Sequence, residues 1–175
     1  LEAIFESPEL FYVVSACSYT YIPSSSGRII SSVSPCYTVN GSDRVDRLTD
    51  EDKQEIRQQQ TVLEQKLAEI MQKVRSDCSD LTKAMYLHDY IAVHCEYDST
   101  LTFRDAYRML INGTGVCQGY MLAYRLLLNR AGVTSSWVQS NSLRHVWSLV
   151  QLDGAWYHID VTWDDSTWFA KSGRK

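Results

Sequence analysis

Residues 145–163 of the chain have the sequence HVWSLVQLDGAWYHIDVTW. Two segments rich in β-branched and aromatic residues flank Asp153-Gly154, a dipeptide that favours a two-residue type I′ turn. The pattern predicts an antiparallel hairpin with strands at 145–152 and 155–163. A two-residue turn places Leu152 opposite Ala155, so the ladder continues with Trp147 opposite Asp160.

The two faces of this hairpin differ in composition. One face is mainly apolar and is expected to pack on the core; it carries Val146, Ser148, Val150, Leu152, Ala155, Tyr157, Ile159 and Val161. The other face carries His145, Trp147, Trp156, His158 and Asp160. His145 and Asp160 are diagonal neighbours, about 7–8 Å apart at Cα, so an imidazole and a carboxylate can meet there. His158 competes with His145 for that contact, and simple solvation of this face is the alternative.

A cysteine lies at the predicted start of a helix upstream of the hairpin. Cys117 follows Asn112-Gly113-Thr114-Gly115 and begins an apolar stripe that ends before Gly132, a suitable C′ glycine. The N–H groups of a first helical turn and the helix dipole favour a thiolate and can bind an oxyanion. Gly115 and Gly119 allow close approach of backbone or substrate. The alternative is that Cys117 is not reactive and only packs as a small buried residue in the first turn.

The remaining elements give the fold class. Extended segments between residues 9 and 40, around a turn at 23–27, predict an N-terminal hairpin. Helices are expected at about 50–75, 82–94, 103–111 and 117–131, with Thr49 and Thr102 as caps that have an aspartate three residues later. Helices followed by antiparallel strands predict an α+β fold.

Composition excludes several classes of protein. The 175 residues are 45% hydrophobic and 22% charged, with a net charge of −4, which is typical of one globular domain. A pI of about 5.5 gives no basic surface for nucleic acid. No apolar run approaches the ~20 residues of a membrane span. No Cys/His spacing resembles a zinc site, and Asp164-Asp165 alone is weak evidence for calcium, so no metal or other cofactor is expected.

Several motifs together resemble one family. Gly115–Tyr120 (GVCQGY), His145–Trp147 (HVW) and Trp156–Asp165 (WYHIDVTWDD) are similar to the motifs of bacterial transglutaminase-like domains, within the transglutaminase and papain-like cysteine peptidase superfamily. Leu87–Tyr90, Glu96–Asp98 and Pro8–Tyr12 resemble flanking segments of this family. One departure is Ser148, where many relatives carry asparagine.

The resemblance implies a papain-like transglutaminase core, with the nucleophile helix packed on an antiparallel sheet. It assigns a catalytic triad to Cys117, His145 and Asp160 and so favours His145 over His158. Residues 1–48 are then an N-terminal extended hairpin segment, 49–80 a connecting helix and 81–168 the catalytic core. Relatives usually continue beyond the position of Asp165, so further strands that complete the sheet are expected beyond this chain or from elsewhere.

A Cys-His-Asp triad predicts a thioester intermediate formed from a protein or peptide amide. Water as acceptor gives a cysteine peptidase or amidase, which is favoured, and a lysine amine gives a transglutaminase. A non-catalytic module that binds peptide or cell-wall polymer is the alternative from another class. Four supporting residues are expected: Tyr97 near the oxyanion, Gln118 beside the nucleophile, and Trp147 and Trp163 as cleft walls or as ordinary sheet packing.

The five cysteines are expected to differ in role. Cys17 and Cys36 are symmetric about the N-terminal turn and are candidates for a cross-strand disulfide. Cys78 and Cys95 flank a helix that separates them by roughly 20 Å, so both are expected to be free thiols. A disulfide indicates an oxidising compartment and favours an extracellular or cell-surface location. The oligomeric state is not predicted.

Overall fold

The computed structural model describes residues 2–39 and 44–165. These residues form six helices and eight strands. In order they are α1 (Glu2–Glu6), β1 (Val13–Ser24), β2 (Gly27–Thr38), β3 (Arg44–Val45), α2 (Asp50–Met71), α3 (Asp80–His94), β4 (Glu96–Tyr97), α4 (Ala106–Asn112), β5 (Thr114–Gly115), α5 (Cys117–Arg130), β6 (Ser135–Ser140), β7 (His145–Leu152), β8 (Ala155–Ile159) and α6 (Val161–Asp164). Of the helices in the described ranges, none is both long and apolar enough to cross a bilayer.

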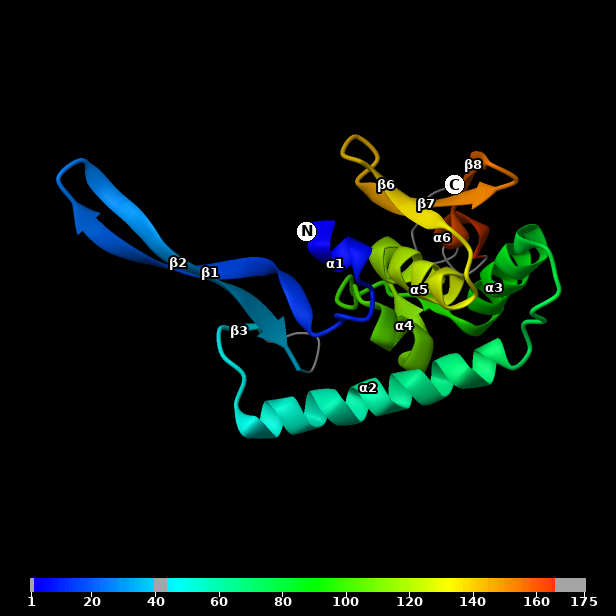
Figure 1. Cartoon of the computed structure of the whole chain (residues 1–175), viewed down its shortest axis with the longest axis horizontal. Helices are drawn as coiled ribbons and strands as arrows, with labels where there is room; N and C mark the ends of the chain where they lie inside the picture. The colour runs from blue at the N-terminus through cyan, green and yellow to red at the C-terminus, as the bar shows by residue number, and fades with distance from the viewer. Residues whose placement is uncertain (1, 40–43, 166–175) are drawn as a thin grey trace.

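Helix α5 is the centre of the core. Ten of its residues, Gly119 to Leu128, are buried, because α3, α4 and strands β6 and β7 all pack against it (Figure 1). A helix that is apolar all round needs neighbours on every side. This arrangement, with antiparallel strands β6-β7-β8 on a helical layer, confirms the predicted α+β fold.

The predicted register of the C-terminal hairpin is correct. Leu152 pairs with Ala155 and Ser148 with Ile159, and both turn residues, Asp153 and Gly154, have the positive φ of a type I′ turn. The second strand is shorter than expected, however, because β8 ends at Ile159 and Asp160 begins helix α6. Asp160 was expected to pair with Trp147 in the ladder, but it lies one residue beyond the end of β8.

The core face of this hairpin is only partly as predicted. On β7, Val146, Ser148, Val150 and Leu152 are buried. On β8 the expectation is wrong, since Ala155 and Tyr157 are exposed, the latter to 51%. A helix about 10 Å across covers roughly two strands spaced 4.8 Å apart, and α5 lies against β6 and β7.

The helix starts follow short-range capping rules more closely than the ends do. Thr49 and Asp52 form the expected capping box of α2, but α2 ends at Met71 rather than near residue 75. Ser79 caps α3, which therefore starts at Asp80. The cap of α4 is Asp105, whose side chain accepts from the Arg108 N–H, not Thr102.

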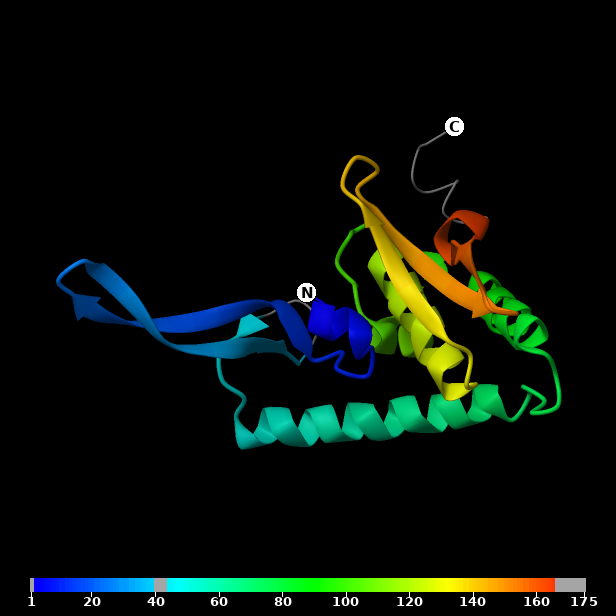
Figure 2. The same ribbon diagram turned by 45° about the horizontal axis from the view of Figure 1, so that its top comes forward.

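The N-terminal hairpin β1-β2 projects from the body of the protein, and α2 runs back along the body (Figure 2). Its register pairs Cys17 with Pro35, so Cys17 and Cys36 lie on opposite faces of the hairpin. Both are free thiols, and Cys36 is buried and donates to Asp46 Oδ1. The expected disulfide is therefore wrong. Cys78 and Cys95 are free, as predicted.

Candidate active site

Cys117 is the first residue of α5 and is half-buried. The N-cap residue, Val116, offers no side-chain hydrogen bond to the first turn. This leaves first-turn N–H groups beside the sulfur for a ligand oxygen. Of the two nearby glycines, only Gly115 is required by packing, because a Cβ there would lie 2.8 Å from Sδ of Met109 on α4. A Cβ on Gly119 would lie 3.5 Å from the Asp105 carbonyl oxygen, an ordinary contact. Gly115 thus lets α4 approach the start of α5 closely.

His145 begins β7 and lies between an acid and the thiol. Its Nε2 is 2.6 Å from Oδ2 of Asp160, and its side chain also hydrogen-bonds Cys117. The ring is only 8% exposed. Burial lowers the pKa of His145, but the hydrogen bonds to Asp160 and Cys117 outweigh it and raise the pKa to about 9. At neutral pH the imidazole is therefore protonated and lies beside the sulfur.

Helix α6 holds Asp160 in place. Asp160 is its N-cap, with Oδ1 accepting from the Trp163 N–H at 3.3 Å. At the other end of α6, His88 Nε2 lies 3.0 Å from Oδ2 of Asp164, and its Nδ1 lies 2.9 Å from Oδ1 of Asp89. The buried Asp165 accepts from the hydroxyl of Tyr120 on α5. Helices α3 and α5 thus both fasten the segment that carries the carboxylate.

Two indoles lie against the His145 ring. Trp163 stacks at a centroid distance of 5.2 Å and Trp147 at 5.5 Å. His158, the rejected competitor, has its Nδ1 hydrogen-bonded by the Trp147 Nε1–H at 2.8 Å. A mainly apolar pocket of about 270 Å³ opens beside these rings; it is lined by Leu143, His145, Trp147, His158, Asp160 and Trp163.

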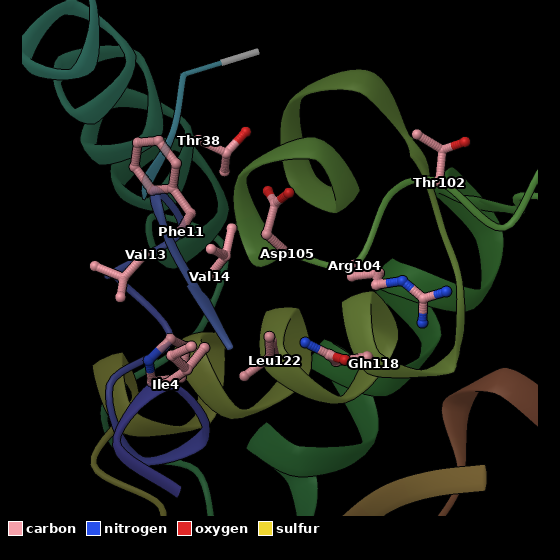
Figure 3. A pocket seen from close by; sticks show the side chains of 11 residues that line it. Ile4, Phe11, Val13, Val14, Thr38, Thr102, Arg104, Asp105, Gln118 and Leu122 are labelled. Atoms are coloured by element: carbon pink, nitrogen blue, oxygen red, sulfur yellow. The ribbon is translucent and has the colours of Figure 1, made fainter. Parts of the chain in front are cut away.

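The other two supporting residues lie elsewhere. Tyr97 is half-buried in β4, and its ring stacks on Tyr120 with centroids 6.4 Å apart. Gln118 lines a second pocket together with Arg104 and Leu122, as Figure 3 shows. The structure therefore brings together Cys117, His145, Asp160 and the two tryptophans. Tyr97 and Gln118 lie outside this group, in contact with other side chains.

Two structural residues were not singled out from the sequence. Asp98 is buried, and its carboxylate accepts from the N–H groups of Thr100, Thr102 and Phe103. Burial raises the pKa of Asp98, but these hydrogen bonds outweigh burial and lower it. The sequence points to His88 only through the segment Leu87–Tyr90. An aspartate followed by Ser-Thr-Leu-Thr is a signal for an Asx-type turn that would have identified Asp98.

Within residues 2–39 and 44–165, no three His, Cys, Asp or Glu side chains gather closely enough to hold an ion. The carboxylates nearest the site, Asp160, Asp164 and Asp165, each point to a different partner.

Comparison with known proteins identifies the superfamily to which the chain belongs. A solved structure described as "Crystal structure of a TGase" is similar, with 18% identity, a TM-score of 0.49 and coverage of 66% of this chain and 34% of that one. The chain thus spans about a third of the length of that structure. No curated protein sequence matches the chain. The model of the transglutaminase-like superfamily matches residues 53–161, well over half of the chain, and the protein belongs to this superfamily.

Proposed function

We propose that the protein is a thiol-dependent acyl-transfer enzyme that acts on protein or peptide amides. Cys117 is the nucleophile, His145 the general acid and base, and Asp160 the group that orients the imidazole. The observation that carries this proposal is the position of His145, buried between the Asp160 carboxylate and the Cys117 thiol, with a pKa raised to about 9. A proton on this imidazole pairs with a thiolate and can then be given to a leaving group.

The chemistry follows from these positions. The sulfur attacks the amide carbonyl carbon, and the oxyanion that forms is bound by first-turn N–H groups of α5. The imidazolium gives its proton to the departing amine as the C–N bond breaks, which leaves a thioester and a neutral imidazole. The imidazole then takes a proton from the acceptor, which attacks the thioester and releases the thiolate. Asp160 stabilises the charged ring in both half-reactions.

Hydrolysis is the favoured reaction. The pocket beside His145 is open to solvent, since Trp163 at its wall is 40% exposed, so water can enter the space that His145 lines. Transamidation is the second candidate because the same pocket is mainly apolar and has two indole walls. Such walls suit the aliphatic stem of a lysine acceptor. The two reactions share every step up to the thioester.

The first test measures thiol reactivity inside the intact protein. Cys17 is exposed, which makes it an internal reference for a thiol without a triad. We expect iodoacetamide at neutral pH to label Cys117 faster than Cys17, as followed by peptide mass spectrometry. His145→Ala should remove that preference. The proposal fails if Cys117 reacts no faster than Cys17 and His145→Ala changes neither rate.

The second test distinguishes hydrolysis, transamidation and a non-catalytic module that binds peptides. The protein is incubated with casein and a biotinylated primary amine, with Cys117→Ala as the control. New peptide termini indicate hydrolysis, and biotin in casein indicates transfer. A module that only binds peptides would give neither product in either variant, even if it retains casein on a column.

A further inference from the structure

A second pocket lies beside the start of α5, and its two walls come from different parts of the chain. One wall belongs to the segment matched by the family model and includes Arg104, Gln118 and Leu122. The opposite wall comes from the N-terminal segment, outside that match, and includes Ile4, Phe11 and Val14. Figure 3 shows Val14, Leu122 and Gln118 around one space, with the Arg104 guanidinium extending outward from its far end. Its volume is about 100 Å³.

The N-terminal wall is fixed to the body of the protein. Phe5 is buried and packs edge-on against Trp137 at 4.6 Å, and Phe11 stacks on Tyr107 at 4.8 Å. The guanidinium of Arg125 donates to the Phe5 carbonyl oxygen and, at 3.2 Å, to Glu6 Oε2. A wall held by buried rings and charged hydrogen bonds keeps its shape when a ligand leaves, which reduces the entropic cost of binding.

The two ends of the pocket differ in polarity. Ile4 and Val13 lie at one end in Figure 3, whereas Arg104 and Gln118 lie at the other. Gln118 directly follows Cys117 in the first turn of α5, so this polar end and the sulfur share one helix terminus.

Arg104 carries an available positive charge. Its guanidinium donates to the Leu101 carbonyl oxygen at 3.1 Å, and within residues 2–39 and 44–165 it forms no ion pair. The neighbouring Asp105 is occupied, because it caps α4 and pairs with Arg108 at 3.0 Å. The Asp98 carboxylate organises the loop that ends at Arg104. The loop therefore presents a cation beside an apolar space.

We propose that this pocket is a substrate subsite that takes an aliphatic side chain of a peptide, with a carboxylate of the same peptide bound by Arg104. The volume suits one aliphatic side chain rather than an indole, and the Arg104 guanidinium, which has no carboxylate partner among the described residues, adds selection for an acidic neighbour. The role of this subsite in catalysis rests on the proposed chemistry at Cys117, but peptide binding does not. The N-terminal segment thereby adds sequence selectivity to a family domain.

The experiment measures binding without turnover. The full chain with Cys117→Ala is titrated against fluorescein-labelled hexapeptides of alanine that carry one leucine and one glutamate at every relative spacing, and anisotropy is recorded. Matched peptides replace leucine by glycine or glutamate by glutamine. On this background, Arg104→Gln removes the cation and Val14→Phe fills the pocket. Arg47→Gln and Val33→Phe make the same changes at exposed sites elsewhere.

One spacing should bind best, with affinity falling roughly 10-fold or more when either side chain is replaced. Arg104→Gln should abolish the preference for glutamate alone, and Val14→Phe the preference for leucine alone, while both control variants bind as the parent does. The subsite is refuted if no peptide is preferred, or if the preferences survive both pocket variants. Slow labelling of Cys117 in the separate iodoacetamide assay would refute the chemistry and leave this result standing.

Discussion

Replacing Asp160 by asparagine tests the charge arrangement of the proposed triad with little change in shape. Asparagine is as good an N-cap as aspartate, so Oδ1 can still accept from the Trp163 N–H and α6 should persist. The other side-chain atom then becomes an amide NH₂ that faces Nε2 of His145, where a carboxylate oxygen now lies at 2.6 Å. A donor in that position favours the tautomer with its proton on Nδ1, which cannot accept a proton from the thiol.

The size of the effect follows from the pKa of His145. Its rise from 6.5 to about 9 represents about 3 kcal/mol, or roughly 300-fold in proton affinity. Asp160 raises the pKa of His145 more than Cys117 does, both through its hydrogen bond and through its charge. Together, the two residues raise the pKa by more than burial lowers it. Removing the larger of two contributors therefore removes more than half of the rise, and the pKa of His145 should fall below about 8.

Two assays follow this change. The pKa of His145 is measured by NMR titration of the ring protons, and kcat/KM for amide turnover is measured across pH. We expect kcat/KM in Asp160→Asn to fall by about 10²–10⁴, with the upper pH limb moving to lower pH along with the NMR titration. Asp153→Asn is the matched control, since Asn-Gly keeps the type I′ turn. An Asp160→Asn enzyme with near-normal turnover and His145 still titrating near 9 would refute the reasoning.

Three further outcomes are expected. Because the folded-state pKa of His145 lies above its unfolded value of 6.5, the protonated ring contributes its full stability below about pH 6, and this contribution disappears as the pH rises through 9. The free energies of unfolding of wild type and His145→Gln, measured in urea, should therefore converge at high pH. A difference that stays constant across this pH range would contradict the prediction. His88→Ala removes the contact to Asp164 and should lower kcat/KM by about tenfold, while Cys117 stays accessible to iodoacetamide. Val93→Ala, at an exposed position of the same helix α3, should change neither. Gly115→Ala should lower the free energy of unfolding by about 1–3 kcal/mol because its Cβ meets Met109 Sδ, while Gly119→Ala, with ordinary contacts, should cost less; equal Tm values would contradict this.

The sequence predicts the local geometry around the C-terminal hairpin well because that geometry depends on neighbours in the chain. The Asp153-Gly154 turn fixes the register, and the register brings His145 and Asp160 to one edge. Likewise, Thr49 and Asp52 determine the start of α2. Such features require only backbone periodicity and the conformations that individual residues favour.

Features that depend on distant contacts were missed or misplaced. The hypothesis of a Cys17–Cys36 disulfide centred the turn on Ser26-Gly27, but Ser24 pairs with Gly27, so the turn lies one residue earlier. Even after the register shift between Thr20 and Tyr21, Cys17 pairs with Pro35 rather than Cys36. The exposure of Tyr157 depends on how far α5 reaches beneath the sheet. The pocket at Gln118 requires an N-terminal segment more than a hundred residues away, which no periodicity within either segment encodes.

The early end of β8 gives a separate contact to each of the three aspartates that follow the hairpin, Asp160, Asp164 and Asp165. A regular strand would alternate Asp160, Thr162 and Asp164 on one face of the sheet, and all three would point away from the core. Helix α6 instead turns Asp160 toward His145, Asp164 toward His88 on α3 and Asp165 toward Tyr120 on α5. Tyr120 lies one helical turn after Cys117, so the carboxylate segment is tied to the helix that carries the nucleophile. A change that loosened α6 would therefore move the acid relative to the thiol, even with all three triad residues still present.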